Sequence, residues 1–201
     1  MNIEGNYKGK LKNGIPDGQG IYMYENGDTY EGKFKNGKKH GYGKLYEYNG
    51  CKYFGNWEND IPNGKGEYYC HNGEMLKGKF VNGLLFGYGK HYAADGKILY
   101  EGNFNRNLYQ GYGIAYYTNG KKFYKGQWYA DFKSKGSYPH GFGIKWLENG
   151  TVQKGMFHLD NFIKSSDDDN YEKKIDSLKT NKVTINEKEM INVLNPIFKN
   201  I

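Results

Sequence analysis

Tyr30-Glu31-Gly32-Lys33-Phe34 is followed by Asn36-Gly37, by His40-Gly41-Tyr42-Gly43 and by Asn49-Gly50, and the same order of residue types returns at Tyr53-Phe54-Gly55-Asn56-Trp57. The step from Tyr30 to Tyr53 is 23 residues, and the same step separates Tyr7 from Tyr30 and Tyr53 from Leu76. Self-similarity at a fixed period is typical of stacked arrays, in which each unit packs only against its neighbours. The sequence therefore predicts a repeat protein.

Later repeats depart slightly from this spacing. The units that open at Tyr100 and Tyr124 each start 24 residues after the preceding one, with one residue added after Gly96 and one after Gly120. Each addition predicts a β-bulge or a longer loop in the strand after the turn. The sixth unit carries six extra residues within 129–138, which form either a loop for a specific partner or a structural element. A half-unit at 154–157 closes the series near Asp160.

Turn dipeptides mark every unit as a β-hairpin. Asn-Gly and Asp-Gly tolerate positive φ at both centres of a type I′ turn, and here they are flanked by strand-forming residues. The pairs assigned to such turns are Asn26-Gly27, Asn49-Gly50, Asn72-Gly73, Asp95-Gly96, Asn119-Gly120 and Asn149-Gly150. The two-residue period of a strand places Tyr30, Gly32 and Phe34 on a packed face and Glu31 and Lys33 in water. Gly32 then leaves room for a ring to lie flat against the backbone.

These features predict an all-β fold, an elongated single-layer antiparallel sheet of about six to seven tandem hairpin repeats with a short helical C-terminal tail. Six units of two strands would be on the order of 60 Å long. Aromatic residues make up 17% of the chain and the mean hydropathy is −0.93, which suits a thin sheet better than a deep aliphatic core. All 30 glycines precede residue 160, so we divide the chain into an array, 1–160, and a tail, 161–201.

The tail combines a linker with helical patterns. Its acidic stretch, 165–170, contains Ser165 and Ser166 as candidate phosphorylation sites. A capping-box pattern from Thr184 to Glu187 predicts a helix that ends at Pro196, and Tyr171, Ile175 and Leu178 mark a second helical stripe. Two interpretations stay open: a cap over the exposed end of the array, or a segment for partner binding or self-association, which includes a homodimer.

The pattern Tyr-Glu-Gly-x-Phe, x-Asn-Gly, x-His-Gly-x-Gly and Asn-Gly resembles the MORN repeat (membrane occupation and recognition nexus) over about residues 5–160. Asp60, Asn107, Leu76 and Gln153 depart from it, as does the insertion. The resemblance implies a non-catalytic module of the kind found in cytoskeletal scaffolds, in proteins near membranes, and beside lipid kinase and lysine methyltransferase domains. We expect no such catalytic domain in the 41 residues after the array.

A scaffold or adaptor would hold a peptide or helix of a partner protein in a groove formed by the ring-bearing strands, because aromatic rings supply much contact area at low entropic cost. The residues predicted to line this groove are Tyr30, Phe34, Tyr42, Tyr53, Trp57, Tyr100, Phe104, Tyr112, Tyr124, Trp128 and Phe142.

Charge offers an alternative partner. The chain carries 29 Lys and Arg against 22 Asp and Glu, and the excess lies entirely in residues 1–160. One interpretation is a basic strip for anionic phospholipids; the other is a solvated face whose lysines alternate with glutamate and prevent edge pairing. We expect no nucleic-acid binding, since the rings that would stack on bases are needed for packing.

No catalytic or cofactor motif is expected. The sequence lacks Gly-Lys-Ser, Gly-Lys-Thr, Cys-x-x-Cys and His-Glu-x-x-His motifs, and His40 and His140 occupy the repeat's own His-Gly position. We therefore predict no enzyme, no metal and no cofactor. Cys51 and Cys70 are expected to be free thiols, and the N-terminus lacks an apolar run. These features favour a cytoplasmic protein, at the cytoskeleton or at the cytoplasmic face of a membrane.

Overall fold

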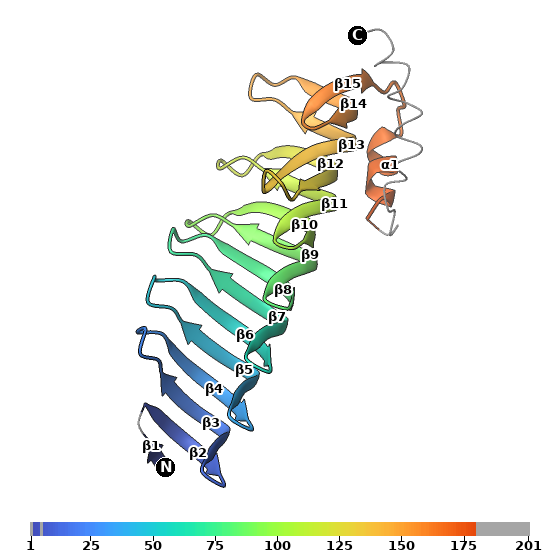
Figure 1. Ribbon diagram of the computed structural model, residues 1–201. Helices are drawn as coiled ribbons and strands as arrows, with labels where there is room; N and C mark the ends of the chain where they lie inside the picture. Colours follow the sequence, from blue (N-terminus) through green and yellow to red (C-terminus); the bar gives the residue numbers. More distant parts are fainter. Residues whose placement is uncertain (1, 5, 180–201) are drawn as a thin grey trace. The chain divides into compact units, whose positions relative to one another are not determined.

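The computed structural model describes residues 2–4 and 6–179, and within these residues it is all-β except for one short helix, α1 (Figure 1). The chain forms two compact units, Met1–Leu99 and Tyr100–Ile201. The prediction of an all-β antiparallel array of hairpins with a helical tail is confirmed.

The first unit is a meander in which each strand is antiparallel to the next one along the chain. Its strands are β1 (Asn2–Glu4), β2 (Tyr7–Lys12), β3 (Ile15–Met23), β4 (Thr29–Lys35), β5 (Lys38–Tyr46), β6 (Lys52–Glu58), β7 (Ile61–Tyr69), β8 (Met75–Val81) and β9 (Leu84–Tyr92).

The second unit repeats the meander and adds the helix. Its strands are β10 (Ile98–Asn105), β11 (Leu108–Tyr116), β12 (Lys122–Asp131), β13 (Gly136–Trp146), β14 (Val152–His158) and β15 (Asn161–Ser165), followed by α1 (Tyr171–Ser177). Neighbours are again antiparallel. Strand β15 extends the sheet five residues beyond position 160, and α1 coincides with the stripe predicted from Tyr171 and Ile175. The helix predicted from Thr184 lies outside the described residues.

The tight turns fall at the other Asn-Gly pair of each repeat. Asn36 and Gly37 have φ of 51° and 80°, which is the type I′ conformation, and they close the hairpin of β4 and β5. Asn26 keeps a negative φ while Gly27 has φ 89°, and the Asn26 side-chain Oδ1 accepts a hydrogen bond from the Asp28 N–H at 3.1 Å. The type I′ assignment of the pairs at 26–27, 49–50 and their equivalents was therefore wrong, because the Asn side chain instead stabilises a longer loop.

One added residue forms the predicted bulge. Pairing between β11 and β12 passes from Ala115 opposite Tyr124 to Tyr116 opposite Lys122, so Phe123 has no partner in the ladder. The loop before it keeps the length of the others, with the Tyr117 N–H bonded to the Lys121 carbonyl as Tyr24 is to Asp28. The extra residue is thus absorbed in the strand.

The six-residue insertion mostly lengthens a hairpin. Tyr129 pairs with Tyr138, Ala130 with Ser137 and Asp131 with Gly136, so β12 and β13 continue beyond the usual repeat. The Ser137 hydroxyl oxygen also accepts a hydrogen bond from the Tyr109 N–H at 2.8 Å. Only the tip, residues 132–135, is a loop, and the rest of the insertion is part of the sheet.

A ladder of rings on one face of the sheet is the core of each unit. The Tyr30 ring meets Phe34 edge to face at 5.0 Å between centroids and Trp57 of the next repeat at 5.4 Å. Its hydroxyl donates to the Lys33 carbonyl at 3.0 Å. A Cβ added at Gly43 would overlap the Tyr30 ring, so glycine there allows the ring to lie flat on the backbone, as predicted. We call this the ladder face.

Candidate interaction surface

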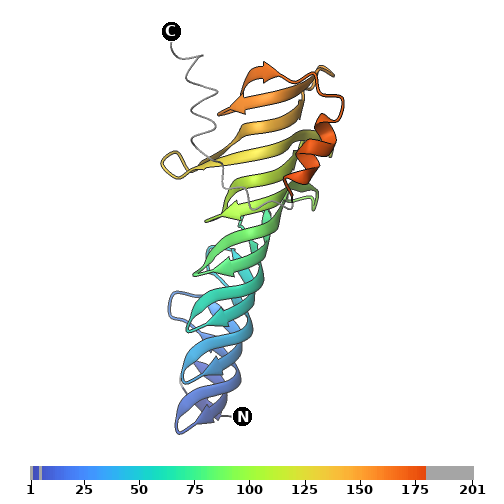
Figure 2. The same ribbon diagram turned by 90° about the vertical axis from the view of Figure 1, so that its right-hand side faces the viewer.

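The face opposite the ladder, here called the outer face, carries different side chains in the two units. In the second unit it is covered by α1, which lies against β11–β14 (Figures 1 and 2). In the first unit the outer face of β5–β9 bears exposed rings and lysines.

Helix α1 buries two side chains on the sheet. Tyr171 and Ile175 are 2% and 0% exposed, and they pack in one cluster with Tyr112, Ile114 and Ile144. The Tyr171 hydroxyl donates to the Gly155 carbonyl at 2.6 Å. Since Tyr171 contacts β14 while Asp176 reaches Tyr112 on β11, the helix runs across the strands. The contact is therefore a helix seated on a sheet face and not a cap over the last strand.

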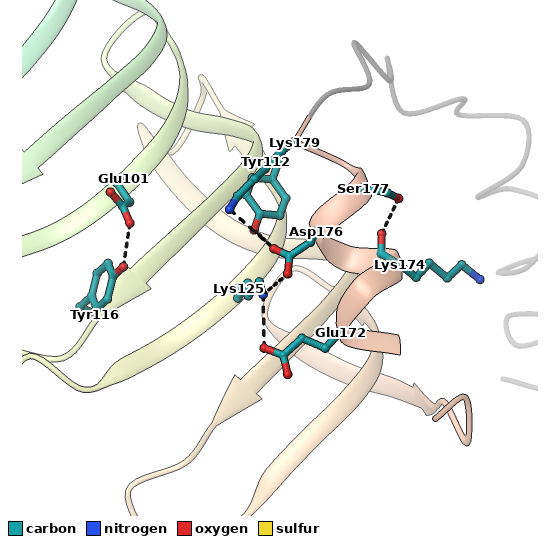
Figure 3. Close-up of polar contacts among 9 residues, drawn as sticks. All are labelled: Glu101, Tyr112, Tyr116, Lys125, Glu172, Lys174, Asp176, Ser177 and Lys179. Carbon is teal, nitrogen blue, oxygen red and sulfur yellow. Dashed lines mark hydrogen bonds and ion pairs between the residues drawn. The ribbon is translucent and has the colours of Figure 1, made fainter. Parts of the chain in front are cut away.

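A buried cation fixes the helix in register. Lys125, whose side chain is 6% exposed, contacts Asp176 at 2.9 Å and Glu172 at 3.3 Å (Figure 3). Asp176 also accepts a hydrogen bond from the Tyr112 hydroxyl at 3.2 Å. Partial burial alone would raise the pKa of Asp176, but the hydrogen bonds and charge of Lys125 lower it overall. Two carboxylates one helical turn apart thus neutralise a lysine that the sheet could not bury alone.

Most of the residues predicted to line a groove are interior. Eight lie in the ladder at 0–4% exposed: Tyr30, Phe34, Tyr53, Trp57, Tyr100, Phe104, Tyr124 and Trp128. Tyr112, at 7%, lies under α1. Only Tyr42 and Phe142, at 58% and 38%, are exposed. The prediction that all these rings line a groove was therefore wrong. The rings that define the repeat are buried in the ladder, and the exposed rings are those at the x of Gly-x-Gly.

Tyr88 was missed by the sequence reasoning. It is 64% exposed and occupies the same repeat position as Tyr42, between Gly87 and Gly89. With Tyr42 it borders a hollow of about 430 Å³ on the outer face, and Phe54, Lys65 and Lys77 also line this hollow. The signal was present in the sequence, because alternation places the x of Gly-x-Gly opposite the ladder.

The MORN repeat family model matches residues 7–29, 30–52, 53–75, 77–98 and 100–122. The chain belongs to the MORN-repeat family. The match ends before the repeat that contains the insertion. MORN repeats are non-enzymatic modules that generally take part in protein or membrane-lipid interactions. A search of curated proteins gave no match.

Lysines dominate the outer face of the first four MORN repeats. Glu31, Glu58 and Glu67 are acids on the outer face of β2–β9, whereas the lysines there are Lys8, Lys10, Lys12, Lys33, Lys35, Lys38, Lys44, Lys52, Lys65, Lys77, Lys79 and Lys90. This face is therefore basic as well as aromatic, and it favours anionic partners.

Neither a metal cluster nor a spanning helix occurs in the part of the chain that the structure describes. No group of three or more His, Cys, Asp or Glu side chains there could hold a metal ion. No helix of these residues is long and apolar enough to cross a membrane. Cys51 is buried and Cys70 is half-buried, and both are free thiols.

His140 gives the MORN array an acid-sensitive point. Its side chain is 5% exposed, and burial together with the His158 ring at 4.9 Å lowers its pKa to about 4. The unfolded chain binds this proton near pH 6.5, so stability is intact above that pH and falls as the pH drops toward 4. We expect a loss of about 2 kcal/mol from this group by pH 4.5 and of roughly 3 kcal/mol below pH 4. Urea unfolding of wild type and His140→Gln at pH 7 and pH 4.5 measures it, and an equal acid loss in both proteins would contradict the assignment.

Proposed function

We propose that the protein is a non-catalytic scaffold or adaptor that binds a partner protein on the outer face of its MORN array. One observation carries the proposal: the outer face of the second unit already holds a helix, while the same face of the first unit exposes Tyr42 and Tyr88. The proposed location is cytoplasmic, at the cytoskeleton or the cytoplasmic side of a membrane, and the proposal needs no cofactor or catalytic residue.

The hollow has the composition of a protein-binding surface. Its rim is aromatic, and its floor includes the backbone of Gly55, Gly66 and Gly78, which allows close approach. Large exposed rings are enriched where proteins meet, since burial of one ring removes much apolar area from water. Neither Tyr42 nor Tyr88 belongs to the buried core, so the stability of the fold does not depend on them.

Affinity capture from native cells with mass spectrometry tests the proposal. We expect a near-stoichiometric partner with the full chain and its loss with Tyr42→Ala/Tyr88→Ala. The control is Tyr48→Ala, an 83% exposed ring in a loop, which should retain the partner. Circular dichroism should be unchanged in all three proteins. A partner that persists with the double variant, or no partner at all, would contradict the adaptor function.

A peripheral lipid-binding function is the second candidate, and the excess of lysine on the outer face favours it. Each lysine close to the surface of an anionic membrane contributes about 1 kcal/mol to the free energy of binding. Sedimentation with phosphatidylserine vesicles at low and high salt separates the two functions. Salt-sensitive binding that survives Tyr42→Ala/Tyr88→Ala would support the lipid module over the adaptor.

A further inference from the structure

We infer that the hollow of the first unit binds an acidic helical segment of the partner protein. The hollow is the surface on the outer face of β5–β9 that is lined by the rings of Tyr42, Phe54 and Tyr88 and by Lys65, Glu67, Lys77 and Lys79. The inference rests on the proposed function and adds the chemistry of the occupant.

Two of the residues that contact α1 in the second unit have equivalents in this hollow, two repeats earlier in the chain. Counted from the opening residue of each repeat, Lys77 stands where Lys125 stands. Once the six-residue insertion is left out of the count, Tyr88 stands where Phe142 stands, at the x of Gly-x-Gly. In the second unit Lys125 binds the helix carboxylates, and Phe142 lies 5.5 Å from the Lys174 ammonium. The hollow therefore keeps the cation and the ring that hold a helix in the second unit.

The hollow differs from the α1 seat in its charge. Ile114 and Ile144, which bury Ile175, are replaced by Glu67 and Lys90, and Tyr112 is replaced by Lys65. The occupant must consequently present more charge at its centre than α1 does. Its apolar contacts then fall on the rings at the two ends, Tyr42 and Tyr88.

Two lysines in the hollow face each other without an acid between them. Lys65 on β7 lies directly opposite Lys79 on β8. Among residues 6–179, no carboxylate forms an ion pair with either one. Like charges directly opposite in a sheet are destabilising. Glu67 does not relieve them, because it is held by Lys77 at 2.7 Å and by the Tyr69 hydroxyl at 2.7 Å. An anionic ligand placed over these strands would offset the repulsion.

The dimensions favour a helix. Tyr42 lies on β5 and Tyr88 on β9, four strand spacings apart, or roughly 19 Å. A helix of about 13 residues covers that distance when it runs across the strands, as α1 does.

The test uses the full chain and a fluorescent, helix-stapled peptide with the sequence of residues 167–179, in which Lys173 and Lys174 are replaced by glutamate. We expect Lys65→Glu/Lys79→Glu to weaken binding at least about tenfold, because two attractive contacts become repulsive. Lys35→Glu/Lys38→Glu is the matched control, since these exposed lysines also face each other across a hairpin. The control should bind like wild type.

A charge-swapped peptide, with lysine at every acidic position, completes the test. It should bind Lys65→Glu/Lys79→Glu more tightly than wild type. Equal binding of the acidic peptide to wild type and Lys65→Glu/Lys79→Glu would overturn the inference. It would indicate that the peptide displaces α1 from β11–β14 instead of binding in the hollow. No peptide binding, with phosphatidylserine vesicles bound instead, would also overturn it. Should peptide binding fail while capture of a partner still depends on Tyr42 and Tyr88, the adaptor function stands and the acidic helix does not.

Discussion

Replacement of Tyr30 by alanine should lower the free energy of unfolding by about 3–5 kcal/mol. Tyr30 is 0% exposed and touches Phe34 of its own repeat and Trp57 of the next. Its ring also covers the backbone of Gly43, where no side chain can fill the space left behind. The cavity would therefore break the ladder between two repeats.

Urea unfolding followed by circular dichroism measures this loss. Tyr42→Ala is the matched control, because Tyr42 belongs to the same hairpin but points from the outer face and is 58% exposed. It should change stability by no more than about 0.5 kcal/mol. Similar losses of stability in the two variants would contradict the proposal that the ladder face stabilises the fold and the outer face is free to bind a partner.

Substitution of Ile175 by aspartate should release α1 from the sheet while the array stays folded. Ile175 is 0% exposed against Tyr112, Ile114 and Ile144, and an aspartate there would place an uncompensated charge in an apolar cluster. The sheet residues in this cluster, Tyr112, Ile114 and Ile144, lie on the outer face and not in the ladder. Hydrogen exchange of residues 171–177 should therefore rise by orders of magnitude, with the strands still protected.

Lys173→Asp serves as the control for this experiment. Lys173 lies on the exposed side of the same helix, so exchange of α1 should remain close to wild type. If Ile175→Asp instead unfolded β11–β14, the helix would be part of the core of the second unit. If exchange did not change, Tyr171 and the polar contacts of Asp176 and Glu172 would be sufficient to hold the helix without Ile175.

The order of residue types was sufficient to predict the hairpins, because a β-strand alternates its faces with a period of two and glycine beside tyrosine leaves room for a flat ring. It did not select the correct tight turn. Two Asn-Gly pairs occur in each repeat, and the one at 36–37 takes positive φ at both residues while the one at 26–27 uses its Asn side chain as an acceptor. Propensity alone does not separate these two uses of the same dipeptide.

The sequence by itself determined the repeat, the ladder and the helical stripe of Tyr171 and Ile175, since each follows from local spacing and local sterics. Only the tertiary structure decided which rings remain open to a partner. Tyr42 and Tyr112 occupy the same repeat position, yet one is 58% exposed and the other is 7% exposed, because α1 folds back over the second. That contact joins residues 64 positions apart, from Tyr112 to Asp176, and depends on Lys125 from a third segment. Burial of this kind depends on contacts between segments far apart in the sequence, so the repeat pattern does not predict it.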